Sequence, residues 1–259
     1  MEKISYAKTV YGQEEIDAVV KCLNESTQMG NYSRKFESEI AKLFEKKTCL
    51  YVNSGSSALY IGIEALEFDK GSEVITPALT FGTTVGCLIK NNLTPVFVDV
   101  EPLTYCIDHN KIEEMITDKT VAILAPNLMG NICKWDIIRE IADKYNLIII
   151  EDSADTIGYT DGGSINGKLS DITTNSFYAS HIINGAGTGG IVCFNNKKLY
   201  ERAKLLRGWG RSSATFNESE DISQRFNVKI SGIDYDAKYI FSEMGYNFLP
   251  SEISAAFAL

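Results

Sequence analysis

A turn of small polar residues, Asn53-Ser-Gly-Ser-Ser-Ala58, separates an apolar run from a segment with helical periodicity. Backbone N–H groups at the start of a helix, together with the hydroxyls of Ser56 and Ser57, can hold a phosphate, because the positive end of the helix dipole lies there. The same residue types are also common as helix caps. The turn therefore predicts either a phosphate site or an ordinary helix start.

An acidic side chain, Asp152, follows the apolar run Leu147–Ile150. Parallel α/β sheets bind ligands at the carboxyl ends of their strands, which is where this residue is expected to lie. An aspartate there can pair with the protonated nitrogen of a pyridine-type cofactor and make the ring a better electron sink. A helix cap or a magnesium ligand is the alternative interpretation.

Three further side chains have types suited to the same site. Phe81 can stack on a flat ring, although a phenylalanine near a strand end is more often core packing. Ser176 offers a second phosphate hydroxyl. His181 offers an acid/base group, since histidine side chains titrate at about pH 6.5. A buried histidine bonded to backbone is the alternative interpretation of His181.

The composition sets limits on the class of protein. The chain has 259 residues, is 44% hydrophobic, and carries 25 Lys+Arg against 34 Asp+Glu, for a formal net charge of −9. Such a chain can form a large domain, and its acidic balance argues against nucleic acid or an anionic membrane as a partner. No signal-peptide pattern and no apolar stretch of about 20 residues is present, so we expect a cytoplasmic protein.

Cysteine and histidine are too scattered to suggest a metal site. The six cysteines stand apart without a C-x-x-C pair, and we expect most of them to be small buried hydrophobes in a reducing compartment. The two histidines are His109 and His181. We expect His109 to be surface structure and no metal to be bound.

Short β-branched runs alternate with helical periodicity along most of the chain. This pattern predicts an α/β fold with a largely parallel sheet covered by helices on both faces. The segments with helical period include Gln13–Leu23, Arg34–Phe44, Ser56–Leu66, Trp135–Tyr145 and Lys197–Leu206. The expected strands are Cys49–Asn53, Glu73–Thr76, Pro95–Val100, Val121–Pro126, Leu147–Glu151, Thr173–Tyr178 and Gly190–Phe194.

The last part of the chain has a weaker pattern. The polar stretch Arg211–Lys238 predicts a long loop or an excursion from the body of the domain. A final helix is expected to begin after Ser251, whose hydroxyl can cap it. That helix is short in this sequence, which favours a chain that stops before a further domain.

Taken in order, six motifs resemble one enzyme family. They are "NSGSSAL", "PALTF", "EDSAD", "SFYASH", "GTGG" and "GYNFLPSEISAA". The chain resembles the DegT/DnrJ/EryC1/StrS family of pyridoxal phosphate (PLP) or pyridoxamine phosphate (PMP) enzymes that act on nucleotide sugars, from about Val10 to Leu259. The resemblance implies the aspartate-aminotransferase-like large domain (fold type I), with a mostly parallel seven-stranded sheet between helices. It further implies an N-terminal segment, 1–34, and a cofactor-binding large domain, 35–259, with the C-terminal small domain missing.

The resemblance also implies roles for the polar residues. Those in contact with the cofactor's phosphate would be Ser56, Ser57 and Ser176. Those around its ring would be Phe81, which stacks on it, Asp152, which pairs with the ring nitrogen, and Asp155, which lies near the ring hydroxyl. Asn247 would reach the phosphate of the neighbouring subunit's cofactor, which implies a homodimer with shared active sites.

His181 stands where this family carries the lysine that bonds covalently to PLP. A histidine cannot form that bond but can still move protons. Together with Gly130-Asn131 and the "GWGR" of Gly208–Arg211, it resembles the 3-dehydratase branch, which removes the C3 hydroxyl of nucleotide-linked 4-keto-6-deoxyhexoses. Ala154 replaces a cysteine of the iron–sulfur sub-branch and no cysteine follows Trp209, so we expect no iron–sulfur cluster.

The implied function is a PMP-dependent dehydratase of deoxysugar biosynthesis. His181 would serve as the acid/base, and an amino donor such as glutamate would regenerate PMP. Two alternatives remain open from the sequence. One is a PLP-dependent aminotransferase relative acting on the same class of sugar. The other is a non-catalytic homologue that binds a nucleotide sugar.

Overall fold

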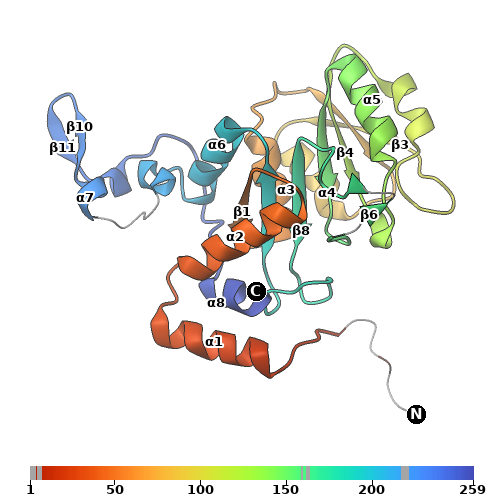
Figure 1. Cartoon of the computed structure of the whole chain (residues 1–259). Coiled ribbons are helices and arrows are strands. Elements are labelled where there is room, and N and C mark those ends of the chain that lie inside the picture. The colour runs from red at the N-terminus through yellow and green to blue at the C-terminus, as the bar shows by residue number, and fades with distance from the viewer. Residues whose placement is uncertain (1–3, 5–7, 159, 162–163, 217–221) are drawn as a thin grey trace.

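Seven strands form one sheet in the computed structural model, which describes residues 4, 8–158, 160–161, 164–216 and 222–259 (Figure 1). Their order is β1-β9-β8-β5-β4-β2-β3, and β9 alone among them runs antiparallel to its neighbours β1 and β8. The sheet is therefore mostly parallel, as expected. Its strands are β1 (Thr48–Val52), β2 (Glu73–Pro77), β3 (Thr94–Val98), β4 (Thr120–Pro126), β5 (Ile148–Asp152), β8 (Ile172–Ser176) and β9 (Gly190–Phe194).

Helices cover the sheet on both faces. The helices of the described residues are α1 (Gln13–Glu25), α2 (Asn31–Leu43), α3 (Gly55–Glu64), α4 (Gly82–Lys90), α5 (Trp135–Tyr145), α6 (Lys197–Arg207), α7 (Ile222–Arg225) and α8 (Glu252–Ala258), and all but α1 and α7 pack on the sheet. Two small hairpins stand apart from the sheet. One pairs β6 (Thr160–Asp161) with β7 (Ser164–Ile165), and the other pairs β10 (Val228–Ile230) with β11 (Ile233–Tyr235). The α/β prediction is confirmed.

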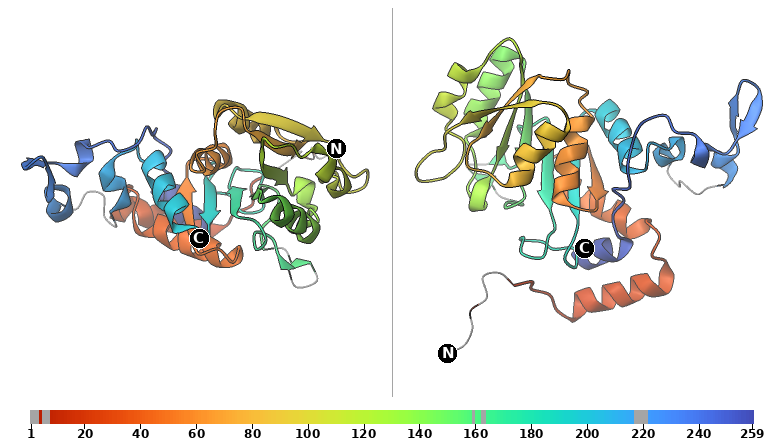
Figure 2. Two further views of the ribbon diagram at one scale, coloured as in Figure 1. Left: turned by 90° about the horizontal axis from the view of Figure 1, so that it is seen from above. Right: turned by 180° about the vertical axis from the view of Figure 1, so that it is seen from behind.

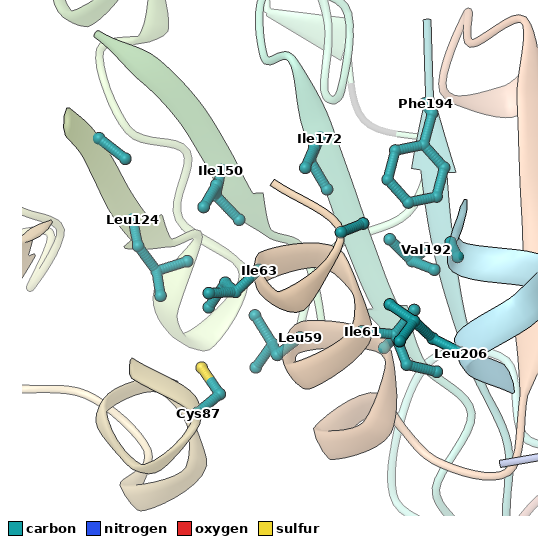
Figure 3. Packing of buried hydrophobic residues seen from close by; sticks show 14 of the residues in the cluster. Leu59, Ile61, Ile63, Cys87, Leu124, Ile150, Ile172, Val192, Phe194 and Leu206 are labelled. Atoms are coloured by element: carbon teal, nitrogen blue, oxygen red, sulfur yellow. The ribbon is translucent and has the colours of Figure 1, made fainter. Parts of the chain in front are cut away.

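One face of the sheet packs on α3, α4 and α6. Ile150, Ile172 and Val192 project from three neighbouring strands and meet Leu59 and Ile61 of α3, as Figure 3 shows. All five are buried. Burying an aliphatic side chain of this size contributes about 1.5–3 kcal/mol, so this layer is a main source of stability.

The opposite face forms two clusters. Alternate residues of the central strands, such as Ile123 and Ile149, pack against Trp135 and Ile138 of α5. Nearer the β1 edge, side chains of α2 and α8 join Tyr51 and other residues of β1 and β9. Side chains of a strand alternate between the two faces, so both layers are filled from the same short apolar runs.

Local sequence explains where several helices begin and end. The hydroxyl of Ser251 accepts a hydrogen bond from the N–H of Ser254, so the predicted cap of α8 is confirmed. At the C-terminal end of α5, Asn146 adopts a left-handed conformation (φ 54°), which asparagine tolerates better than most residues. At α3 the cap is Ser54, whose hydroxyl accepts from the N–H of Ser57.

A buried glutamate ties the final helix to the N-terminal helices. Both carboxylate oxygens of Glu252 accept bonds from the N-terminus of α2: from the N–H of its cap, Gly30 (2.8 Å), from the N–H of Tyr32 (2.7 Å) and Ser33 (3.2 Å), and from the Ser33 hydroxyl (2.6 Å). Helix α1 lies alongside α8 as well (Figure 2). The predicted boundary between residues 34 and 35 falls inside α2, and that division stays a prediction.

Of the two alternatives for Arg211–Lys238, a continuous loop is wrong for part of the stretch, whereas an excursion agrees with the described residues. After α6 the chain forms α7 and the β10–β11 hairpin, which project from the body of the molecule in Figures 1 and 2. The turn of the hairpin is Ser231-Gly232, and both residues have positive φ (51° and 82°). Residues 217–221 lie outside the described part of the chain.

Cysteine pairing departs in part from the sequence-based expectation. Cys49 of β1 and Cys193 of β9 face each other in the antiparallel register and form a disulfide. The other four cysteines are free and buried, as expected of small apolar side chains. The four are Cys22, Cys87, Cys106 and Cys133.

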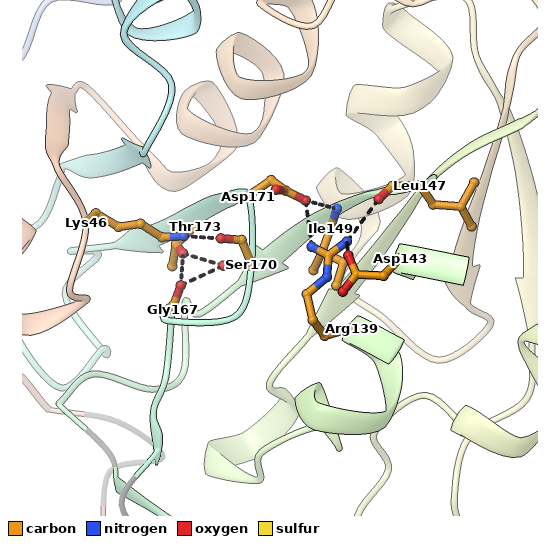
Figure 4. A network of polar contacts seen from close by, with 9 residues as sticks. All are labelled: Lys46, Arg139, Asp143, Leu147, Ile149, Gly167, Ser170, Asp171 and Thr173. Atoms are coloured by element: carbon orange, nitrogen blue, oxygen red, sulfur yellow. Dashed lines mark hydrogen bonds and ion pairs between the residues drawn. The ribbon is translucent and has the colours of Figure 1, made fainter. Parts of the chain in front are cut away.

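The amino edge of the sheet contains a buried lysine. The amine of Lys46 donates to the carbonyl of Ser170, and the neighbouring Asp171 accepts from Arg139 (Figure 4). Burial lowers the pKa of Lys46 to about 8.

Among the residues that the structure describes, no helix combines the length and apolar character needed to cross a membrane.

Candidate cofactor site

The Asn53–Ser57 turn packs directly against Ser176 at the carboxyl edge of the sheet. A Cβ added to Gly55 would lie 2.6 Å from the Cβ of Ser176, closer than two carbon atoms can approach. Gly190 meets Ser54 in the same way. Glycine is therefore required on both sides of this contact, which brings Ser57 and the exposed Ser56 at the start of α3 close to Ser176.

Ser54 was missed by the sequence analysis. Its hydroxyl caps α3 and lies 3.0 Å from the hydroxyl of Ser57. A serine two residues before the predicted pair therefore performs the capping, and Ser56 remains exposed at the positive end of the helix. The position of Ser54 three residues before Ser57 is the usual signal for such a cap.

Asp152 ends β5 and is buried, with an exposed fraction of 6%. Its carboxylate accepts bonds from the Thr84 hydroxyl (3.1 Å) and from the N–H of Ala154 (3.2 Å). Burial raises the pKa of Asp152 to about 6 despite these bonds, and the nearby charge of Asp155 acts in the same direction. Burial takes the carboxylate out of water, so a positive partner beside it would stabilise its charged form.

His181 lies in the turn after β8 and faces Asp155. Its Nδ1 atom is 3.1 Å from the carbonyl oxygen of Ser176, and its Nε2 atom is 3.9 Å from Oδ1 of Asp155. The side chain of His181 is 22% exposed. The alternative interpretation, a core histidine bonded to backbone, explains the contact of Nδ1 with Ser176. It does not explain why Nε2 faces Asp155 in a side chain that is partly exposed.

Phe81 precedes α4 and is 71% exposed. Core packing, the alternative interpretation, is therefore wrong for this residue. One helical turn later, Thr84 is fully buried and reaches Asp152. Thr84 was not predicted, because α4 itself was not: its sequence GTTVGCLIK is rich in glycine and β-branched residues, which form helices poorly.

A buried polar network supports the end of β5 from the other face of the sheet. Glu151 has no exposed surface and accepts from the side chains of Asn127 (2.8 Å) and Ser153 (2.8 Å) and from the N–H of Gly167 (2.9 Å). Burial raises the pKa of Glu151. The network connects β4, β5 and the loop before β8, and it thereby fixes the strand end that carries Asp152.

Asn247 lies close to the Asn53–Ser57 turn in its own chain. The adjacent carbonyl, that of Phe248, accepts a bond from the N–H of Asn53 (3.0 Å). The side chain of Asn247 is exposed, and its oxygen accepts from the N–H of Leu249 (3.2 Å). Its predicted role toward a neighbouring subunit stays a prediction.

The "GWGR" segment takes a constrained conformation. Trp209 and Gly210 both have positive φ (60° and 78°), and a Cβ at Gly210 would lie 1.8 Å from the carbonyl oxygen of Glu243. The guanidinium of Arg211 stacks over the Trp209 ring at 4.2 Å. Glycine is thus required at position 210 by the close approach of the segment that leads to Asn247.

Two other features do not coincide with this site. A cavity of about 900 Å³ is lined by α2, α6 and the segment after α6, and no predicted site residue lines it. Glu101, Asp108 and His109 have potential ligand atoms within 4.8 Å of one another. Their contacts already account for the group, since His109 pairs with Glu101 at 2.9 Å and Asp108 caps a short 3₁₀ turn. The side chain of His109 is 15% exposed, so it is less of a surface residue than expected.

The sheet order and the ligand edge define the class of protein, the fold type I PLP-dependent enzymes. The structure of an E. coli GDP-4-keto-6-deoxy-D-mannose-3-dehydratase with bound hydrated PLP superimposes with a TM-score of 0.87. Its sequence is 29% identical, and the match covers 100% of this chain and 67% of that one.

The family follows from the sequence. The family model of the DegT/DnrJ/EryC1/StrS aminotransferase family matches residues 10–259, and the chain belongs to that family. A dTDP-4-dehydro-2,6-dideoxy-D-glucose 3-dehydratase of Saccharopolyspora spinosa is 37% identical over 89% of this chain and 52% of its own length. A GDP-perosamine synthase of Caulobacter vibrioides is 32% identical over 100% of this chain and 64% of its own length. The chain thus spans between half and two thirds of these relatives.

The residues present fit a PLP or PMP group. Asp152 is buried with an elevated pKa, and a pyridinium nitrogen would supply the positive charge that it lacks. The glycine cradle beside Ser176 and the N-terminus of α3 fit a phosphate. Phe81 is exposed at the same edge, where a ring can stack on it.

Proposed function

We propose that this protein is a PMP-dependent dehydratase that removes the C3 hydroxyl of a nucleotide-linked 4-keto-6-deoxyhexose in deoxysugar biosynthesis. The observation that carries the proposal is His181 at the ligand edge, with Nε2 left available by the bond of Nδ1 to Ser176. A histidine cannot hold the cofactor covalently. In the described residues, no contact joins a lysine to Asp152, Asp155 or Ser176 that would replace that function.

The chain's own residues divide the work of binding. Ser56, Ser57 and Ser176 hold the cofactor's phosphate at the start of α3, and Phe81 stacks on the ring. Asp152 keeps the ring nitrogen protonated. When bound, PMP supplies an amine that bonds to the C4 carbonyl carbon of the sugar and a ring that accepts electrons.

His181 moves the protons. Its Nδ1 atom is engaged by the Ser176 carbonyl, so Nε2 is the atom that takes a proton from the carbon that carries the cofactor's amine. The same atom returns a proton to the departing C3 hydroxyl, which leaves as water. A positioned acid/base of this kind contributes a factor of about 10²–10⁴ to the rate.

The overall chemistry requires two electrons, because the sugar loses an oxygen and keeps its C4 ketone. We propose that glutamate supplies them: its amine carbon is oxidised to the ketone of 2-oxoglutarate, and ammonia is released. An aminotransferase would instead transfer the glutamate nitrogen to the sugar. The two reactions therefore differ in where the nitrogen goes.

We also propose a cytoplasmic homodimer with shared active sites. Apolar side chains stand exposed around the site, among them Phe81 (71%), Met129 (74%) and Tyr178 (59%), and a second subunit would cover them. Asn247, exposed beside the phosphate turn, would then contact the neighbouring subunit's cofactor.

The test uses the protein expressed at its natural length. It is loaded with PMP and incubated with glutamate and with GDP-, CDP- and dTDP-linked 4-keto-6-deoxyhexoses, and the products are analysed by mass. We expect a sugar that has lost one oxygen, with equal amounts of ammonia and 2-oxoglutarate. His181→Ala should reduce turnover by a factor of about 10²–10⁴, whereas His109→Gln, at the other histidine, should not.

Other outcomes assign other functions. A sugar that gains nitrogen without release of ammonia would identify an aminotransferase. Binding of PMP and nucleotide sugar without turnover would favour the non-catalytic homologue. Wild-type activity in His181→Ala would remove the histidine from the mechanism.

A further inference from the structure

We infer that Asp155 is a positioning residue for His181: it holds the imidazole with Nε2 toward the reacting atoms and stabilises the ring while it carries a second proton. This inference rests on the proposed function, because it assigns His181 the proton transfer. It differs from a contact between Asp155 and the ring hydroxyl, which the family resemblance implies. The geometry around His181 provides the argument.

The two ring nitrogens of His181 have different partners. Nδ1 lies 3.1 Å from the Ser176 carbonyl oxygen, which can only accept, so Nδ1 carries the hydrogen in the neutral ring. Nε2 then has the free lone pair. When Nε2 takes up a proton, the imidazolium faces the carboxylate of Asp155, 3.9 Å away.

That distance suits a temporary proton carrier. At 3.9 Å the two atoms are too far apart for a hydrogen bond, so the carboxylate stabilises the imidazolium through space and does not take its proton. The proton therefore stays on Nε2 and remains available for the departing hydroxyl. A neutral partner at position 155 would provide no such stabilisation.

Asp155 is itself fixed by the turn after β4. Its Oδ2 atom accepts from the N–H of Met129 (2.9 Å), which leaves Oδ1 for His181. Met129 and Gly130 both have positive φ (56° and 85°), and Gly130 contributes to the "GN" pair noted in the sequence. This turn thereby connects the ends of β4, β5 and β8 through Met129, Asp155 and His181.

The surroundings of His181 contain few other titratable groups in the described part of the chain. Asp152 interacts electrostatically with both Asp155 and His181. The ring of Tyr178 lies edge-on to the imidazole with centroids 6.1 Å apart. Asp152 is paired with Thr84 and the Ala154 N–H, whereas Asp155 has a carboxylate oxygen 3.9 Å from Nε2.

The experiment replaces the charge and keeps the shape. In Asp155→Asn the amide oxygen can still accept from Met129, while the negative charge beside Nε2 is lost. We expect kcat to fall about tenfold and the acid limb of the kcat–pH profile to move to lower pH, a modest effect because both side chains are partly exposed and solvent screens the charge. Affinity for PMP should be unchanged, and Asp155→Glu should recover part of the activity.

Glu101→Gln is the matched control. It removes a carboxylate from the other histidine, His109, in a pair of 2.9 Å outside the site. We expect the kcat–pH profile of this variant to match that of the wild type. An equal change in both variants would mean that a general loss of charge is responsible, and it would overturn the inference.

A second readout does not depend on activity. The ¹⁵N signals of the two histidines can be assigned with His181→Asn, and their tautomers followed by NMR in the PMP-bound protein. Because the Ser176 carbonyl fixes the hydrogen on Nδ1, we expect the neutral Nδ1–H form at His181 in both proteins, and we expect the Nε2 signal to show that the imidazolium forms at lower pH in Asp155→Asn than in the wild type. Formation of the imidazolium at the same pH in both proteins would overturn the inference, as would a loss confined to PMP affinity. If the wild type has no dehydratase activity, the proposed function fails, while the NMR titration still tests the role of Asp155.

Discussion

The contact between Gly55 and Ser176 allows a sharp test of the phosphate turn. A Cβ at position 55 would lie 2.6 Å from the Cβ of Ser176, 3.0 Å from its Oγ and 3.3 Å from its Cα. Carbon atoms pack at about 3.5–4.0 Å, so Gly55→Ala has to separate the turn from β8 by roughly 1 Å. One of the clashing atoms is backbone, which cannot rotate away.

The expected cost combines two effects. Overpacking of this kind costs about 1–3 kcal/mol, and alanine regains little helix propensity at the first position of α3. We expect the free energy of unfolding to fall by about 2 kcal/mol in urea titrations. Because the phosphate ligands move apart, affinity for PLP, followed by absorbance, should fall about tenfold or more.

Gly86→Ala is the matched control for this substitution. Gly86 lies inside α4, has no atom within 4 Å of its added Cβ, and should gain up to about 1 kcal/mol from helix propensity. Combining Gly55→Ala with Ser176→Gly removes the clashing side chain and should restore part of the lost stability. If Gly55→Ala is as stable as Gly86→Ala and binds PLP as the wild type does, the reasoning about this contact is refuted.

Two further predictions concern stability. Glu252→Gln places an amide nitrogen among the donors at the N-terminus of α2, Gly30–Ser33, and should lower the free energy of unfolding by about 2–3 kcal/mol, with earlier proteolysis near α1. Unchanged stability would contradict the role of the carboxylate. The pKa of Lys46 is lowered from 10.5 to about 8 by burial, so between these pH values the unfolded chain binds more protons than the folded one. Stability should therefore rise by about 3 kcal/mol from pH 8 to pH 10.5. Urea titrations of Lys46→Met should lack this rise, and a wild type without it would refute the argument.

The sheet was predictable from the sequence because most of its strands are short runs of apolar and β-branched residues, and several of them, such as β4 and β5, are buried on both faces. Helix α5 was predicted with its observed bounds, Trp135–Tyr145, since its apolar positions repeat at three and four residues. Helix α4 was missed because its stability comes from packing of Thr84, Cys87 and Leu88, which no local propensity reveals. The Ser231-Gly232 turn is a hairpin signal that could have been recognised.

The site was predictable in its components but not in its contacts. The strand ends placed Asp152 and Ser176 at the same edge, as the rule for parallel sheets requires. The separation of Asp155 from His181 depends on the course of two turns, and periodicity carries no information about such turns. The buried network of Glu151 could not be predicted either, because a buried carboxylate is recognisable only when its hydrogen-bond donors are known from the structure.

The place of β1 at one end of the sheet, paired with β9, has a consequence for the order in which the chain folds as it is synthesised. Cys49 and Cys193, which face each other in these strands, are 144 residues apart. At 5–20 residues per second, β1 emerges from the ribosome on the order of ten seconds before its partner. The phosphate turn after β1 is thus made early but gains its contacts with Ser176 and Gly190 late. We therefore expect cofactor to be captured only after most of the sheet has formed.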